Sequence, residues 1–159
     1  MQTTDPIPDT AMLAWRRFLR AHCTIERELD AELRAQHNLT INDYDVLVQL
    51  RDTERGLRMS DLAEQVVLTR SGITRLIDGL VREQLVERVS CAKDARVAYA
   101  RLTRLGRERM AEARCTHHRG IRRVFADHFS EAELAQLAEL LAKLPSAERS
   151  RCCGSSSGE

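Results

Sequence analysis

Two short amphipathic segments lie almost end to end near the middle of the chain, and this arrangement most constrains the fold. Residues 60–66 and 69–84 both carry apolar side chains at helical spacing, and only a few residues separate the two patterns. Ser60 and Thr69 are residue types that cap helix N-termini. The sequence therefore predicts a helix, a tight turn and a second helix.

Two strand-like segments follow this pair directly. Residues 85–89 and 97–102 are rich in β-formers, and the polar residues 90–96 between them suit the tip of a hairpin. Before the pair, residues 57–59 are too short for anything but a strand stub or a connector. A helix pair followed by a short hairpin predicts a winged helix-turn-helix.

Longer helical patterns lie on both sides of this centre. Residues 11–36 form one apolar face, and a second helix ends before the charged turn that begins at Asp52. Three local signals mark the other helix starts: a capping box from Thr40 to Asp43, a cap at Thr103, and a capping box from Ser130 to Glu133. The sequence predicts a mainly α fold with a small β-hairpin wing and with N- and C-terminal dimerisation helices.

The chain is expected to form a single unit. We expect residues 11–144 to fold together, with residues 1–10 and 145–159 as disordered ends. Within the unit, residues 42–102 form the winged lobe, and residues 11–36 and 103–144 form the dimerisation helices. Their apolar faces predict packing against a second copy, and a monomer with these helices folded back on the centre is the alternative.

Composition narrows the class of protein. No apolar run is long enough to span a membrane, and the first residues lack the pattern of a signal peptide, so we expect a cytoplasmic protein. The net charge of +1 is distributed unevenly, because residues 55–109 hold twelve Lys/Arg against seven Asp/Glu. A basic centre between acidic ends suits an anionic partner such as double-stranded DNA.

The helix that begins near Thr69 is expected to read that DNA. Its N-terminal turns would enter the major groove, where arginine binds guanine bidentately and hydroxyls reach bases or phosphates. The hairpin tip would place Arg96 in the minor groove, with Asp94 orienting the guanidinium or simply forming the turn. The candidate DNA-binding residues are Ser60, Thr69, Arg70, Ser71, Thr74, Arg75, Lys93, Asp94 and Arg96.

These segments together resemble the MarR family of bacterial transcriptional regulators. The resemblance rests on residues 57–63, 69–86, 94–96 and 102–106 in this order, and it extends over about residues 15–144. It implies obligate dimers, near-palindromic operators, and repression that a small molecule, a metal or an oxidant relieves. The wing motif Asp-x-Arg of the family maps onto Asp94 and Arg96, and Ala95 stands where many members have a second arginine.

The resemblance also suggests what is sensed. Trp15 and Arg20 resemble the Trp-x4-Arg element of the urate-responsive branch, and Asp45 could be the acidic partner across the pocket. With His22 beside them, these residues suit a small aromatic or anionic ligand. In the alternative interpretation Trp15 anchors the dimer core and Arg20 is a surface residue.

Other chemistries have weaker support in the sequence. Cys23 could be a redox-sensing thiol, or an inert packed cysteine. Cys115, His117 and His118 match no standard metal-site spacing, so neither a metal nor another cofactor is expected. No phosphate loop, metalloprotease helix or nucleophile elbow is present, so an enzyme is not expected. A helical protein-interaction module remains an alternative, but it would not need the basic hairpin.

Overall fold

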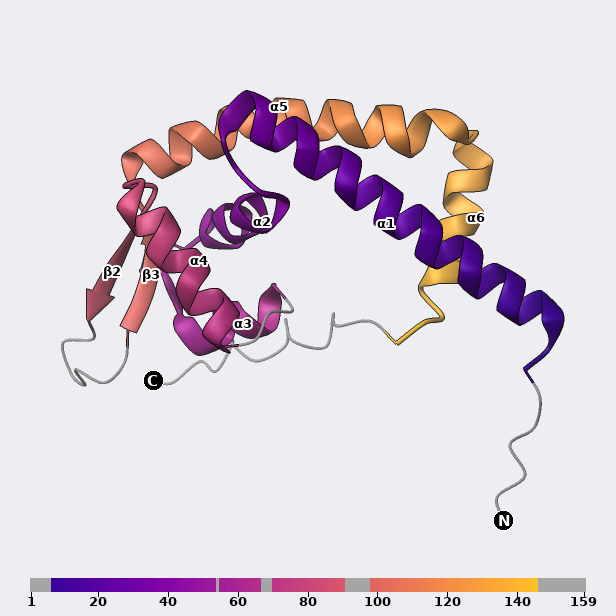
Figure 1. Cartoon of the computed structure of the whole chain (residues 1–159), viewed down its shortest axis with the longest axis horizontal. Coiled ribbons are helices and arrows are strands. Elements are labelled where there is room, and N and C mark those ends of the chain that lie inside the picture. The colour runs from indigo at the N-terminus through magenta and orange to yellow at the C-terminus, as the bar shows by residue number, and fades with distance from the viewer. Residues whose placement is uncertain (1–6, 54, 67–69, 91–97, 146–159) are drawn as a thin grey trace, which may run out of the picture.

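The computed structural model describes residues 7–53, 55–66, 70–90 and 98–145, and of Arg70 and Ser71 only the backbone. It confirms a mainly helical winged-helix fold (Figure 1). In chain order the elements are α1 (Asp9–His37), α2 (Ile41–Leu50), β1 (Leu57–Arg58), α3 (Met59–Gln65), α4 (Arg70–Arg82), β2 (Val86–Ser90), β3 (Ala98–Leu102), α5 (Arg104–Val124), the 3-10 turn η1 (Ala126–His128) and α6 (Glu131–Leu141).

Side-chain caps begin three of these helices, as predicted. The Thr40 hydroxyl accepts from the Asp43 amide at 3.0 Å, and the Asp43 carboxylate accepts from the Thr40 amide at 2.8 Å. Ser130 and Glu133 form the same reciprocal box. At α5 the Gly106 amide donates to the Thr103 hydroxyl at 2.9 Å. Each cap satisfies an amide that the first helical turn leaves without a partner.

The predicted cap at Ser60 is wrong. Helix α3 begins at Met59, its N-cap is Arg58, and no side chain caps it; the Ser60 hydroxyl instead donates to the Asp61 carboxylate at 3.0 Å. The reason lies in the sheet. Arg58 is held in extended backbone because it pairs with Tyr99, so the helix starts directly after that pairing.

The sheet has three antiparallel strands in the order β1-β3-β2. Strands β2 and β3 form the expected hairpin, with Val86 opposite Leu102 at its root and Ser90 opposite Ala98 toward its tip. The stub at Leu57 is a true strand that adds to the free edge of β3. The tip itself, residues 91–97, lies outside the described residues.

The molecule divides into a lobe and an arm (Figure 1). In the lobe, α2, α3, α4 and the sheet enclose the core, where Leu47, Leu50, Leu62 and Ile77 are fully buried. In the arm, α1 and α5 lie side by side, and α6 turns down at the far end. None of the helices in the described ranges is both long and apolar enough to cross a membrane.

Candidate nucleic-acid interface and pocket

Helix α4 presents two different faces because of its sequence. Ile73, Ile77 and Leu80 recur at helical spacing and are at most 2% exposed, so they fix the helix to the lobe core. Thr74 and Arg75 fall on the other side and are exposed. Ser60 is exposed on α3, which packs against α4. Three of the predicted DNA-binding residues are thus exposed on the two helices of the helix-turn-helix.

The other predicted DNA contacts are described only in part or not at all. Arg70 and Ser71 lie in the first turn of α4, as expected, but only their backbone is described. The remaining predicted residues lie outside the described residues: Thr69, Lys93, Asp94 and Arg96.

An ion pair joins helix α4 to the hairpin. The Asp78 carboxylate of α4 lies 2.9 Å from the Arg88 guanidinium of β2. Both side chains are partly solvent-exposed, so the pair adds little stability. This link was not predicted from the sequence. The only sign of the ion pair in the sequence was an acidic residue, Asp78, on the outer face of α4 and a basic residue, Arg88, in the strand that follows.

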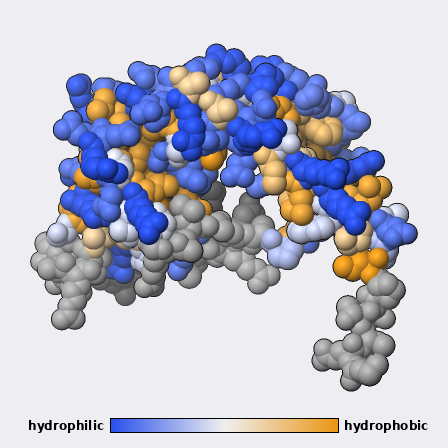
Figure 2. Space-filling view, viewed as in Figure 1, coloured by the Kyte–Doolittle hydropathy of each residue, from blue (hydrophilic) through white to orange (hydrophobic). Residues whose placement is uncertain are grey.

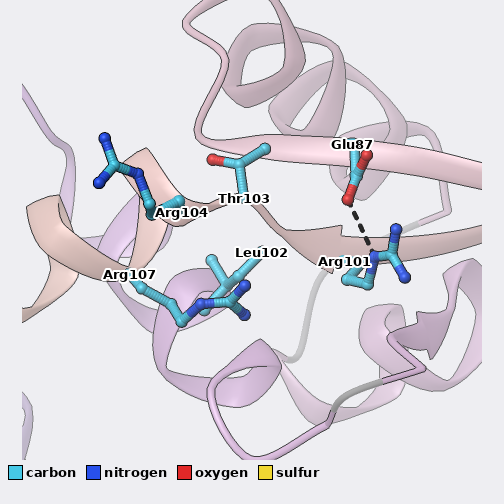
Figure 3. Close-up of a pocket in the computed structure, with 6 residues that line it drawn as sticks. All are labelled: Glu87, Arg101, Leu102, Thr103, Arg104 and Arg107. Carbon is cyan, nitrogen blue, oxygen red and sulfur yellow. Dashed lines mark hydrogen bonds and ion pairs between the residues drawn. The ribbon is translucent and has the colours of Figure 1, made fainter.

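Three arginines gather at the root of the wing, at the end of the hairpin away from its tip (Figure 3). Arg101, Arg104 and Arg107 line a depression of about 440 Å³ with Glu87, Leu102 and Thr103. Arg101 is paired with Glu87 at 2.9 Å, while Arg104 and Arg107 point in different directions. The cations therefore do not converge on one point where an anion could sit.

A second pocket, of about 300 Å³, lies where the arm meets the lobe. Helix α1 contributes four of its residues, α2 contributes three, and α5 contributes one. The lining residues are His22, Ile25, Glu26, Leu29, Ile41, Asn42, Asp45 and His117. Of the predicted ligand-binding residues, His22 and Asp45 therefore meet in one pocket.

The titratable groups of this pocket are two carboxyl groups, Glu26 and Asp45, and two imidazoles, His22 and His117. The Asp45 side chain reaches solvent, yet the protein packed around it raises its pKa, and the nearby Glu26 carboxylate raises it further. Burial lowers the pKa of His117, and His118 adds to that effect, so the His117 imidazole is neutral at pH 7. The lining residues include no lysine or arginine.

Sequence reasoning missed Glu26 as a pocket residue and treated His117 only as a weak metal candidate. The spacing could have indicated Glu26, because it follows the predicted His22 by four residues and so lies on the same face of α1. The His22 Nδ1 and Glu26 Oε2 atoms lie 3.8 Å apart. The half-buried His117 ring packs against Tyr44, with ring centroids 4.6 Å apart. Its Nδ1 atom is buried without a hydrogen-bond partner among the described residues.

Trp15 and Arg20 do not line this pocket. Five residues along an α-helix rotate a side chain by about 140° from the starting direction, so the two cannot face one site on the same chain. Trp15 is 54% exposed and stacks on Phe18, whose ring lies 6.4 Å from His22. Trp15 thus belongs to an aromatic row that leads to the pocket rim, and Arg20 is an exposed surface residue.

The described residues also locate the predicted thiol and metal candidates. Cys23 and Cys115 are both exposed, and neither lines the pocket. The rings of His117 and His118 lie 6.5 Å apart. In the part of the chain that the structure describes, no three His, Cys, Asp or Glu side chains are grouped so as to hold a metal ion.

Comparison with known proteins identifies the family. A family model described as MarR family matches residues 37–97, which span α2 to the wing. An HTH-type transcriptional regulator from Bacillus cereus strain ATCC 14579 is 30% identical over 132 residues, covering 83% of this chain and 86% of the relative.

Two solved structures from Streptomyces coelicolor share the whole architecture. AbsC, a MarR family transcriptional regulator, is 33% identical, with 93% of this chain and 99% of AbsC covered and a TM-score of 0.80. A second MarR family regulator, solved in complex with DNA, is 26% identical over 89% of both chains, with a TM-score of 0.82. The chain therefore belongs to the MarR family and is a DNA-binding transcriptional regulator with a winged helix-turn-helix.

Proposed function

We propose that this regulator is a homodimeric repressor that binds a near-palindromic operator and leaves it when a small molecule binds the pocket between lobe and arm. The observation that carries the proposal is the exposure of α6: none of its eleven residues is buried. An amphipathic helix gains little from folding unless its apolar face is covered. A second copy of the chain supplies that cover.

The apolar side chains that need a partner lie on the arm. Figure 2 shows hydrophobic side chains gathered at the end of the molecule where α1 begins and α6 lies. Each is at least 39% exposed, and on α1, α6 and their flanks they are Leu13, Trp15, Phe18, Leu19, Phe129, Leu140, Leu141 and Leu144. Monomeric proteins rarely leave so many large apolar groups together in water. We therefore assign dimerisation to residues 11–36 and 103–144.

A dimer of this kind presents two reading helices to DNA. Insertion into successive major grooves requires the two α4 helices to lie about one turn of DNA, roughly 34 Å, apart. Arg70 and Arg75 then bind base edges, Thr69, Ser71 and Thr74 bind bases or phosphates, and Ser60 faces the backbone. The wing places Arg96 in the minor groove, flanked by Lys93 and oriented by Asp94. Such a protein works on the chromosome, so we place it in the cytoplasm.

The position of the pocket supports release by a ligand. Ile41, Asn42 and Asp45 belong to α2 of the lobe, whereas the other lining residues belong to α1 and α5 of the arm. A molecule that wedges between these walls changes the angle between lobe and arm. It therefore changes the spacing of the two reading helices and favours a state that does not fit the operator.

The wing assignment is tested with DNA selected by the purified protein from random fragments. Arg96→Ala is expected to weaken binding by about 1 to 3 kcal/mol while the dimer stays intact in light scattering. Arg104→Ala is the matched control, because it removes an equally basic side chain, 90% exposed, at the opposite end of the hairpin. Equal affinities for the Arg96→Ala variant and the parent would exclude the wing from the interface.

A further inference from the structure

We infer that the pocket between α1, α2 and α5 accepts a small organic ammonium ion with an apolar body, rather than an organic anion. The inference rests on the proposed function, because it takes this pocket as the effector site. It replaces the anionic ligand suggested by Trp15 and Arg20, which do not line the pocket.

The first argument is the set of charges around the cavity. Glu26 on α1 and Asp45 on α2 both line it, and no lysine or arginine does. A carboxylate ligand would meet two carboxylates and no lysine or arginine, so its desolvation would be poorly compensated. An ammonium group would pair with both through charge-assisted hydrogen bonds.

The second argument is the mutual influence of the two carboxyl groups. The pKa of Asp45 is raised by the protein around it and by Glu26, and both influences disfavour two negative charges in the empty pocket. A bound cation removes that disadvantage, so part of the binding free energy comes from relief of the repulsion already present.

The third argument is the unsatisfied imidazole. His117 lines the pocket from α5, and its buried Nδ1 has no hydrogen-bond partner among the described residues. Because burial keeps this ring neutral at pH 7, one of its nitrogens carries a lone pair. An ammonium group has three donors, which is enough for Glu26, Asp45 and an acceptor nitrogen of His117, all of which line the pocket.

The rest of the pocket defines the body of the ligand. Ile25, Leu29 and Ile41 give an apolar wall, and the volume of about 300 Å³ is at the lower limit for small-molecule sites. The aromatic row of Trp15, Phe18 and His22 leads to the rim. A primary amine on a single aromatic ring fits this combination of size, apolar wall and acidic end.

The test compares three probes of similar size and different charge on the full-length protein. Isothermal titration calorimetry at pH 7.5 would measure 2-phenylethylamine, 2-phenylethanol and phenylacetate. We expect the amine to bind at least about tenfold more tightly than the alcohol or the acid, as expected for a hydrogen-bonded charge. Equal affinities, tighter binding of phenylacetate, or no heat of binding with millimolar amine would overturn the inference.

Variants assign the preference to the two carboxylates. Glu26→Gln and Asp45→Asn should each weaken amine binding about tenfold and leave binding of the alcohol unchanged. Glu112→Gln, which removes an exposed carboxylate of α5 outside the pocket, should change neither. Thermal melts check that each variant is folded. If neither pocket variant changes amine binding, or if zinc chloride binds this pocket in place of the amine, the inference is wrong.

A separate measurement keeps the inference and the proposed function apart. Binding of the selected DNA is followed by fluorescence anisotropy with and without the amine. If the amine binds through Glu26 and Asp45 but DNA stays bound, the ligand class is right and release by this pocket is wrong. If the amine does not bind while the dimer still binds DNA, the ligand class is wrong and the repressor assignment stands.

Discussion

The imidazole of His117 on α5 packs against the phenol ring of Tyr44 on α2, with the ring centroids 4.6 Å apart and an interplanar angle of 43°. Tyr44 is 4% exposed and belongs to the lobe core, whereas His117 also lines the pocket at the junction with the arm. The same imidazole therefore contacts the folded core and forms part of the pocket lining. Its protonation state bears on stability.

We expect His117→Phe to make the protein less sensitive to mild acid. Burial lowers the pKa of His117 below its ordinary value of 6.5, so the unfolded chain binds this proton more readily than the folded chain. The corresponding stability is present above pH 6.5 and is lost as the pH falls through the lowered folded value. Phenylalanine keeps the ring contact with Tyr44 and cannot titrate. Thermal melts between about pH 8 and pH 5 should show a shallower decline in Tm.

The control for this experiment is His128→Gln, at an exposed histidine of η1. It should leave the decline in Tm as steep as in the parent. A slope that is the same in the parent and in His117→Phe would show that other groups cause the acid sensitivity.

Thr103 joins three elements, and its replacement should destabilise the fold. Its hydroxyl accepts from the Gly106 amide at 2.9 Å, which caps α5, and donates to the Gln84 carbonyl at 2.7 Å in the turn before β2. We expect Thr103→Ala to lower the free energy of unfolding by about 1 to 2 kcal/mol, because both the cap and the tie are lost. Thr103→Ser keeps the hydroxyl and should lose less than half as much in urea denaturation. Equal losses would assign the effect to the methyl group.

The caps show which parts of this fold could be predicted from sequence. Thr40, Thr103 and Ser130 were predicted correctly because a cap depends on residues within one helical turn. Ser60 has the right residue type but does not cap α3, because pairing of Arg58 with β3 sets where that helix begins. The pairing partner, Tyr99, lies some forty residues further along the chain and decides where α3 begins. A pattern of neighbouring residues does not contain this information.

The pocket shows the same limit at a functional site. His22 and Asp45 were predicted, whereas Glu26 was missed, and His117 was assigned to a different chemistry. These residues come from three helices, so only the packing of α1 and α5 against α2 reveals that their side chains meet. Arg20 was predicted from its spacing to Trp15, but helix geometry points the two in different directions.

Arg75 should contribute to sequence-specific binding more than Arg82 does. Arg75 is exposed opposite the buried face of α4, whereas Arg82 lies at the C-terminal end and donates to the Asp78 carbonyl at 3.3 Å. We expect Arg75→Ala to weaken binding to selected DNA by about 1 to 3 kcal/mol and to relax the preference at one base position. Arg82→Ala should have little effect in the same anisotropy titration at fixed salt. A uniform loss across all DNA sequences would instead make Arg75 a phosphate contact.

A matched pair of leucines tests the dimer surface. Leu141 on α6 and Leu105 on α5 are 39% and 41% exposed, and both fall within the residues assigned to the dimerisation helices. Only Leu141, however, belongs to the group of exposed apolar side chains on α1, α6 and their flanks. In a two-fold symmetric dimer each substitution occurs twice, and an apolar side chain of this size contributes about 1.5 to 3 kcal/mol when buried. We therefore expect Leu141→Glu to raise the dimer dissociation constant by at least about a hundredfold.

Light scattering over a range of protein concentrations would follow the mass of both variants. Leu105→Glu should keep the mass of a dimer and bind selected DNA as the parent does, whereas Leu141→Glu should dissociate and lose the affinity that two reading helices provide together. Loss of DNA binding by Leu141→Glu without a change in mass would separate the role of α6 from dimerisation. Dissociation of both variants would extend the interface to the start of α5, where Leu105 lies beside the wing root, and would show that the exposed side chains of α1 and α6 do not space the two α4 helices alone.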